Sequence, residues 1–180
     1  MPNKMMPGSR PQQTRAETEA IFRAHGLEPG DKVMMLAVRG YYRDSMGKPG
    51  VNDQGIYDDA YFVLAPGVHR SFNFNTDPQK VNAKHAKLKP QIIKYAKGKH
   101  KNKYRALRPF PEGVKLECTR DGVTSWCALT NIHMGGAFNT YSEGCMTLPP
   151  DQHDEARDLV YSLMDKYGQK TADVLLIENR

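Results

Sequence analysis

The sequence predicts an α+β domain, with a β-rich mixed sheet or sandwich and one helix near each end of the chain. Short apolar or alternating runs between Gly, Pro, Asn and Asp clusters predict strands through the middle. Apolar residues recur at helical spacing near both ends. With 180 residues, 39% hydrophobic and 26% charged, the chain fits one domain. We expect a flexible leader over 1–13, rich in Pro and Met, and a single domain over 14–180.

The first helix is expected to begin at Thr14, because Thr14 and Glu17 have the spacing of a capping box. Gly26 supplies a stop, so this helix should end near His25. The second helix should cover 151–167, after two prolines and before Gly168. Its apolar face would contain Ala156, Leu159, Val160, Leu163, Met164 and Tyr167.

Two apolar runs near the beginning of the chain, 32–42 and 59–65, have strand composition and should be neighbours in a sheet. The segment between them is dense in Gly, Pro, Asn and Asp, which predicts a long surface loop that frames a cleft. The next run, 68–75, alternates with the period of two typical of a strand. The apolar run VLLIE near the end of the chain predicts a final, buried strand.

The clearest hairpin predicted by the sequence has Asp121-Gly122 at its turn. Its second strand should run to His133, which places that histidine at a strand end. A two-residue turn puts Cys118 opposite Ser125 and leaves the sulfurs of Cys118 and Cys127 out of register. We therefore expect both cysteines to be reduced and structural.

Eleven of the 26 Lys and Arg residues lie in the segment 79–108, which contains no acid. We expect a solvated basic insertion there, with 104–107 returning to the sheet. The alternative is a nucleic-acid-binding module, in which the basic side chains contact phosphates and Tyr95 and Tyr104 stack on bases. We expect nucleic acid to be the less favoured partner.

The chain contains neither a run of about 18 apolar residues nor the apolar stretch of a secretory signal. We expect synthesis in the cytoplasm without a signal peptide and no membrane span. A target outside the cell membrane would then require a delivery device, and an immunity or delivery protein would be a natural partner. The sequence does not indicate an oligomeric state.

The segment NIHMGGAFNTYSEGCMTLPP (131–150) is the most informative part of the chain. It contains His133 before a Gly-Gly turn and Cys145 after a glycine. A cysteine becomes nucleophilic as a thiolate, and a neighbouring imidazole lowers its pKa. Gly144 leaves room for a substrate carbonyl, and the amides of Gly144 and Cys145 are expected to stabilise an oxyanion. We find no third or fourth ligand at metal-site spacing and expect neither a metal nor a cofactor.

The sequence HMGG followed by SEGC, with strands on both sides, resembles the catalytic motif of L,D-transpeptidases, cysteine enzymes that act on bacterial peptidoglycan. The strong likeness covers about 20 residues. The segments 39–60 and 95–108 resemble uncharacterised phage or prophage proteins that have the same site. The resemblance implies an L,D-transpeptidase-type fold and acyl transfer on the peptide stems of the cell wall through a thioester.

The resemblance also implies roles for single residues. Cys145 would be the nucleophile and His133 the general base, oriented by the main-chain carbonyl of Met134. Ser142 and Gly144 would shape the catalytic loop. The chain departs from the family pattern in having Glu143 where a second histidine is common, Met146-Thr147 where an Arg or Asn is common, and a shorter spacing between His133 and Ser142.

Substrate binding is assigned by charge and by position in the motif. Peptide stems carry carboxylates, so we expect them to contact Arg39, Arg43 or the basic segment. Gly135, Gly136 and Glu143 are expected to border the substrate. A third interpretation of the whole chain is a catalytically inactive scaffold that binds cell wall.

Overall fold

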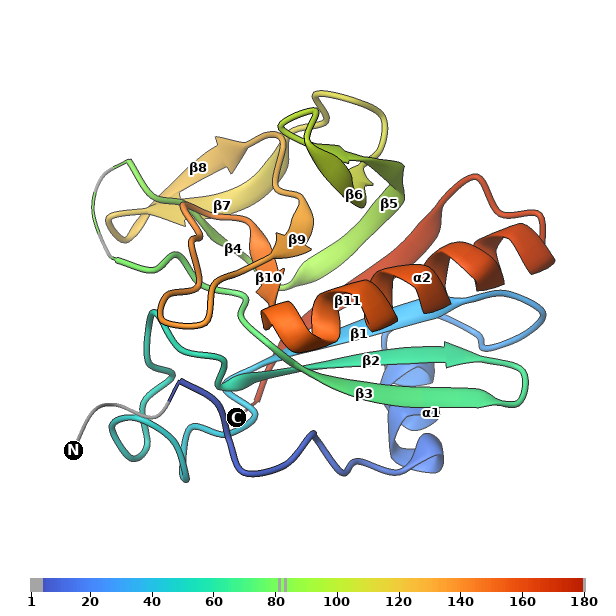
Figure 1. Ribbon diagram of the computed structural model, residues 1–180, viewed down its shortest axis with the longest axis horizontal. Helices are drawn as coiled ribbons and strands as arrows, with labels where there is room; N and C mark the ends of the chain where they lie inside the picture. The colour runs from blue at the N-terminus through green and yellow to red at the C-terminus, as the bar shows by residue number, and fades with distance from the viewer. Residues whose placement is uncertain (1–4, 81, 83, 180) are drawn as a thin grey trace.

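The computed structural model describes residues 5–80, 82 and 84–179. Two helices and a strand-rich mixed sheet confirm the α+β class (Figure 1). The helices are α1 (Arg15–Ala24) and α2 (Pro150–Lys166). The strands are β1 (Met34–Arg39), β2 (Asp59–Ala65), β3 (Val68–Phe74), β4 (Lys87–Leu88), β5 (Gln91–His100), β6 (Tyr104–Pro109), β7 (Leu116–Arg120), β8 (Val123–Cys127), β9 (Ile132–Met134), β10 (Met146–Leu148) and β11 (Ala172–Glu178).

The main sheet has eight strands in the order β10-β9-β6-β5-β11-β1-β2-β3. The pairs β1 with β11 and β9 with β10 are parallel, and the others are antiparallel. A bridge between Asn75, just after β3, and Thr147 of β10 brings the two ends of the sheet together. The sheet is therefore nearly closed. A smaller sheet has the order β4-β7-β8.

The centre of the main sheet is buried on both faces. Every residue of β1 and β2 is buried, as expected for strands covered on two sides. On one face, Phe22 of α1 packs with Met34, Leu36 and Phe62. Helix α2 lies over the other face (Figure 1), and its Val160 joins the larger core.

The predicted helices and the first strands are confirmed. The Thr14 side chain accepts a hydrogen bond from the Glu17 amide at 3.2 Å, and the Glu17 carboxylate accepts one from the Thr14 amide at 2.7 Å. The expected pairing of β1 with β2 is present. The final strand, β11, lies between β1 and β5 in the middle of the sheet. Among the described residues, no helix has the length and apolar character needed to cross a membrane.

The leader expected over 1–13 is only partly described, because residues 1–4 lie outside the described part. The described part of it, 5–13, contacts the domain. The carbonyl of Met5 accepts from the Tyr57 amide at 2.9 Å. The Arg10 guanidinium forms an ion pair with Glu155 at 2.6 Å.

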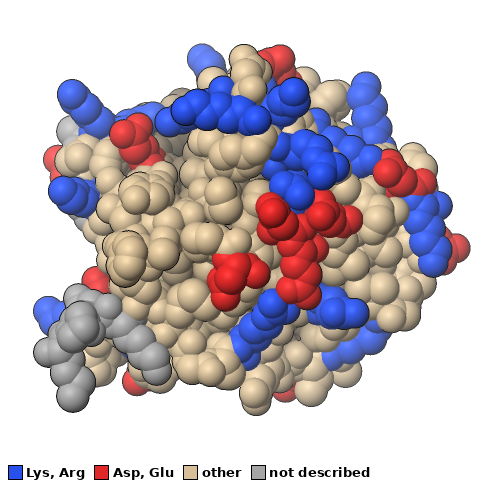
Figure 2. Space-filling view, in the orientation of Figure 1, with Lys and Arg blue, Asp and Glu red and all other residues tan. Residues whose placement is uncertain are grey.

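The basic segment 79–108 is not a separate insertion, because it contains β5 and β6 of the main sheet. Acidic side chains from other parts of the chain pair with many of its charges. Figure 2 shows this mixture: basic side chains in the upper part of the molecule lie directly beside acidic ones. The pairs include Lys87–Asp77, Lys89–Glu117, Lys94–Asp173, Lys97–Asp165 and Arg105–Asp158.

The expectation that Cys118 and Cys127 are reduced is also wrong, because they form a disulfide. The predicted register is correct, with Cys118 opposite Ser125. The two cysteines are diagonal neighbours across the hairpin, and diagonal neighbours lie within reach of each other in a twisted ribbon. Their Cα atoms are 6.2 Å apart, within the range that a disulfide spans.

Candidate functional site: Cys145 and His133

Cys145 and His133 lie at the same end of the main sheet and border one cavity. The strand predicted to run to His133 stops at Cys127, and His133 lies in the separate strand β9. Strand β10 pairs with β9 in parallel, with Thr147 opposite His133, and Cys145 directly precedes β10. The two residues line one cavity of about 270 Å³. The other lining residues are Gln79, His100, Lys101, Tyr141 and Glu143.

The His133 ring is held by a main-chain carbonyl. Its Nδ1 lies 2.8 Å from the carbonyl oxygen of Met134 and 3.3 Å from the Tyr104 hydroxyl. A carbonyl accepts but cannot donate, so Nδ1 carries the proton and Nε2 is the basic nitrogen. This is the carbonyl contact that the motif implies for Met134.

A second histidine, His100 at the end of β5, stacks on His133. The ring centroids are 3.8 Å apart and the rings are inclined by 14°. The Asn131 side-chain amide donates to His100 Nδ1 at 3.1 Å. Burial and the neighbouring His100 lower the pKa of His133 to about 4. At neutral pH the imidazole is therefore uncharged and able to accept a proton.

The Cys145 sulfur is the free thiol of the chain and is half-buried. It lies 3.7 Å from the carbonyl oxygen of Leu129. We expected His133 to lower the pKa of this thiol. Burial instead raises the pKa of Cys145 to about 11, opposed by the Asn131 amide and the charge of Lys101. The resting pair is a neutral thiol and a neutral imidazole, so the thiolate must form during the reaction.

Ser142 and Gly144 shape the loop that carries Cys145. The Ser142 hydroxyl donates to the Cys145 carbonyl and accepts from the Gly144 amide at 3.2 Å. The Gly144 amide is therefore occupied, and its expected role as an oxyanion donor is wrong. Among the described residues the Cys145 amide has no acceptor, so it remains the oxyanion donor of the two.

Replacing Gly144 by Ala should distort this loop. Gly144 has a φ of 150°, and an added Cβ would lie 2.9 Å from the Ala86 carbonyl oxygen. We expect Gly144→Ala to lower the free energy of unfolding by about 2–4 kcal/mol, measured by urea denaturation. The control is Gly122→Ala, where φ is also positive but no atom lies within 4 Å. That variant should lose about 1–2 kcal/mol, and equal losses would contradict the proposed clash.

Of the three motif residues expected to border the substrate, Glu143 lines the cavity and the two glycines do not. The Gly135 amide donates to the Leu148 carbonyl at 2.8 Å, and the Gly136 amide donates to that of Asn139 at 2.8 Å. The Tyr57 hydroxyl donates to the Gly136 carbonyl at 2.7 Å. The glycines thus build the loop and do not contact the cavity.

Arg39 and Arg43 do not line the Cys145 cavity, so their assignment to its substrate is wrong. Arg39 is 2% exposed and forms an ion pair with Asp77 at 3.2 Å. Arg43 donates to the Asn179 carbonyl at 2.8 Å. Both lie beside a separate cavity of about 170 Å³.

Sequence reasoning missed His100 and Tyr104 as site residues and named Lys101 only as a member of the basic segment 79–108. They belong to the turn between β5 and β6, where Lys101 and Asn102 both have a positive φ. An Asn in a short basic segment between two potential strands is a turn signal. It could have revealed the hairpin, but not that β6 pairs with β9 and brings the turn to His133.

The described residues contain one cluster with the donors of a metal site, formed by Asp58, Asp59 and Asp77. All three are buried, and their ligand atoms lie within 4.8 Å of one another. Burial and mutual repulsion raise the pKa of Asp58 to about 9 and that of Asp59 to about 7. The Arg39 guanidinium and the Lys87 ammonium group form ion pairs with Asp77 and supply positive charge to this cluster.

The raised pKa of Asp58 predicts that stability falls as pH rises. Between the ordinary value of 3.8 and about 9, the folded chain binds more protons than the unfolded chain, so alkali favours unfolding. Asp58→Asn supplies an uncharged side chain whose NH₂ can donate to the neighbouring carboxylates. We expect it to raise the free energy of unfolding at pH 8 by about 1–2 kcal/mol, with a weaker pH dependence than wild type. The exposed Asp44→Asn is the control, and a variant as pH-sensitive as wild type would refute the assignment.

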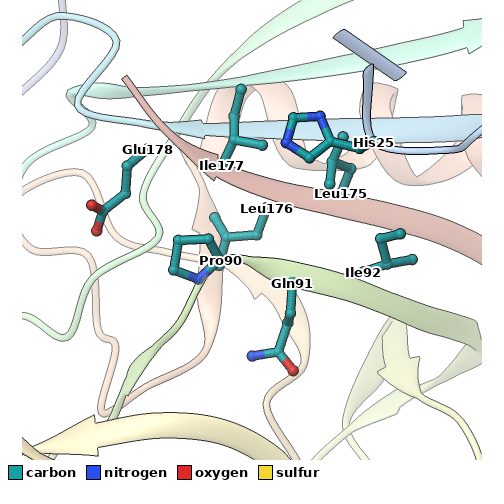
Figure 3. Close-up of a pocket in the computed structure, with 8 residues that line it drawn as sticks. All are labelled: His25, Pro90, Gln91, Ile92, Leu175, Leu176, Ile177 and Glu178. Atoms are coloured by element: carbon teal, nitrogen blue, oxygen red, sulfur yellow. The ribbon is translucent and has the colours of Figure 1, made fainter. Parts of the chain in front are cut away.

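A larger cavity, about 530 Å³, lies elsewhere, along β5 and β11. Figure 3 shows its lining, which includes His25, Ile92, Leu175 and Ile177. Its lining contains no cysteine, and its titratable residues are His25 and Glu178. The chemistry therefore points to the smaller Cys145 cavity.

Of these two cavities in the described part of the chain, the smaller one at Cys145 combines a nucleophile with a base. Comparison of this chain with protein-family models, with curated proteins and with solved structures found no match.

Proposed function

We propose that this protein is a cysteine acyltransferase or peptidase of the L,D-transpeptidase type, acting on the peptide stems of bacterial peptidoglycan. The observation that carries the proposal is the His133 ring, fixed through Nδ1 by the Met134 carbonyl beside the cavity that contains Cys145. A histidine held in this way offers Nε2 as a base. The HMGG and SEGC sequences supply the substrate class.

The proposed reaction starts from the neutral pair. As the Cys145 sulfur attacks the amide carbonyl of the stem, its proton moves to His133 Nε2. The Cys145 amide donates to the developing oxyanion. Collapse of the tetrahedral intermediate breaks the C–N bond, and the Nε2 proton goes to the leaving amine. The resulting thioester is resolved by an amine, giving transpeptidation or amino-acid exchange, or by water, giving hydrolysis.

The test is incubation of the purified protein with peptidoglycan sacculi, followed by mass spectrometry of the released and cross-linked stems. The proposal expects a changed stem profile and an acylated protein whose added mass is located on Cys145. Hydrolysed and exchanged stems differ in mass, so the same experiment separates water from an amine as acceptor. An unchanged profile at high protein concentration would refute the proposal. The substrate implies action in the periplasm or cell wall after delivery.

The structure gives less support to the nucleic-acid-binding alternative. Tyr95, expected to stack on bases, is 0% exposed, and its hydroxyl donates to the Thr130 carbonyl at 2.9 Å. Many basic side chains of the segment 79–108 already have acidic partners. Phosphate contacts would have to compete with these ion pairs.

A further inference from the structure

We propose that the Cys145 cavity recognises a ligand with two opposite charges, with Lys101 receiving a carboxylate and Glu143 an ammonium group. The ligand class is an amino acid, or the amino-acid end of a peptide. This inference rests on the proposed function, because an amino acid is then both a leaving group and an acceptor. Lys101 and Glu143 are the residues that would select this amino acid.

The two charges border the same cavity from different elements. Lys101 lies in the turn between β5 and β6, and Glu143 lies in the loop before β10. Both side chains are exposed. Four lysines of the same basic segment have acidic partners within 4 Å, whereas neither Lys101 nor Glu143 forms an ion pair with a described residue. The cavity therefore offers one uncompensated charge of each sign to a ligand.

Both charges act on the nucleophile. The charge of Lys101 lowers the pKa of Cys145 and that of Glu143 raises it, against the larger effect of burial. The two side chains are thus near enough for a ligand that contacts them to lie beside the sulfur. The stacked imidazoles of His100 and His133 are uncharged at neutral pH, because burial lowers the pKa of each. Charge selection consequently depends on Lys101 and Glu143.

The test uses the sulfur as a probe of its own cavity. Cys145 is alkylated at pH 8.5 with iodoacetate, which carries a carboxylate, or with neutral iodoacetamide. Mass spectrometry of the intact protein gives the two rate constants, and the rate constant for iodoacetate is divided by that for iodoacetamide. Lys101→Gln should lower this ratio about three-fold, and Glu143→Gln should raise it by a similar factor. Lys99→Gln, an exposed lysine of β5 that does not line the cavity, is the matched control and should leave it unchanged.

A second measurement tests recognition itself. Alanine should slow the reaction of Cys145 with iodoacetamide more strongly than N-acetylalanine or alaninamide, each of which lacks one charge. Lys101→Gln should remove the advantage over alaninamide, and Glu143→Gln the advantage over N-acetylalanine. Equal protection by all three compounds, or ratios that neither variant changes, would overturn the proposal.

Alkylation of Cys145 does not require enzymatic turnover. The experiments can therefore refute either proposal without refuting the other. Charge-dependent alkylation without any change in sacculi would refute acyl transfer on peptidoglycan and leave the recognition intact. Conversion of sacculi with unchanged alkylation ratios would refute the recognition and leave the proposed function.

Discussion

Cys145→Ala should abolish the change in the stem-peptide profile of sacculi and the covalent acyl adduct of the protein. The sulfur is the only atom of the cavity that can form the thioester, so no residual route through an acyl-enzyme remains. The loss should exceed about a thousand-fold, because replacement of a nucleophile removes the covalent pathway as a whole. The measurement is mass spectrometry of the stems and of the intact protein.

Cys145→Ser separates loss of chemistry from loss of fold. Serine is close in size to cysteine. It should keep the main-chain contacts of the loop, including the hydrogen bond that the Ser142 hydroxyl donates to the carbonyl of residue 145. This variant should unfold at the same urea concentration as wild type and still fail to convert sacculi. Undiminished conversion by Cys145→Ala would end the catalytic proposal.

His133→Ala should lower the rate of stem conversion by about 10²–10⁴-fold, the usual contribution of a general base. The effect should be large because the pKa of Cys145 is about 11, which leaves very little thiolate at neutral pH without a proton acceptor. His25→Ala, a change in the unrelated cavity over β11, should leave the rate unchanged. Retention of more than a tenth of the rate in His133→Ala would contradict the assigned base.

The pH dependence of the wild type tests the same assignment. A neutral imidazole is required, and the pKa of His133 is about 4, so kcat/KM should stay high as pH falls from 7 to 5 and decline only near pH 4. His100→Phe keeps a ring on His133 but removes an imidazole that, once protonated at low pH, lowers the pKa of His133. The decline should therefore move to higher pH in this variant. A decline near pH 6.5 in the wild type would contradict the lowered pKa of the His133 imidazole.

Local patterns were sufficient to predict much of the fold. The capping box at Thr14 and Glu17, the helical spacing in 151–167 and the Asp121-Gly122 turn depend on residues close together in the sequence. Each of these elements lies where the sequence placed it, within a few residues. That Cys145 and His133 border one cavity was also predictable, because they are only 12 residues apart in the sequence.

The errors arose where distant segments meet. Strand β5 looks like a solvated basic segment in the sequence, yet it pairs with β11, which is about 80 residues away. Acidic partners such as Asp165 and Asp173, which compensate its lysines, come from the end of the chain. The stacking of His100 on His133 likewise depends on the pairing of strands that lie far apart in the sequence. Local periodicity contains no information about these contacts.

The disulfide between Cys118 and Cys127 bears on how the protein can be studied chemically. With those two sulfurs bonded to each other, the native chain has one thiol, and it borders the cavity with the candidate base. A maleimide dye or spin label would therefore attach at a single, known position without any engineering of the sequence. Ligands that enter the cavity could then be followed by the signal of that label.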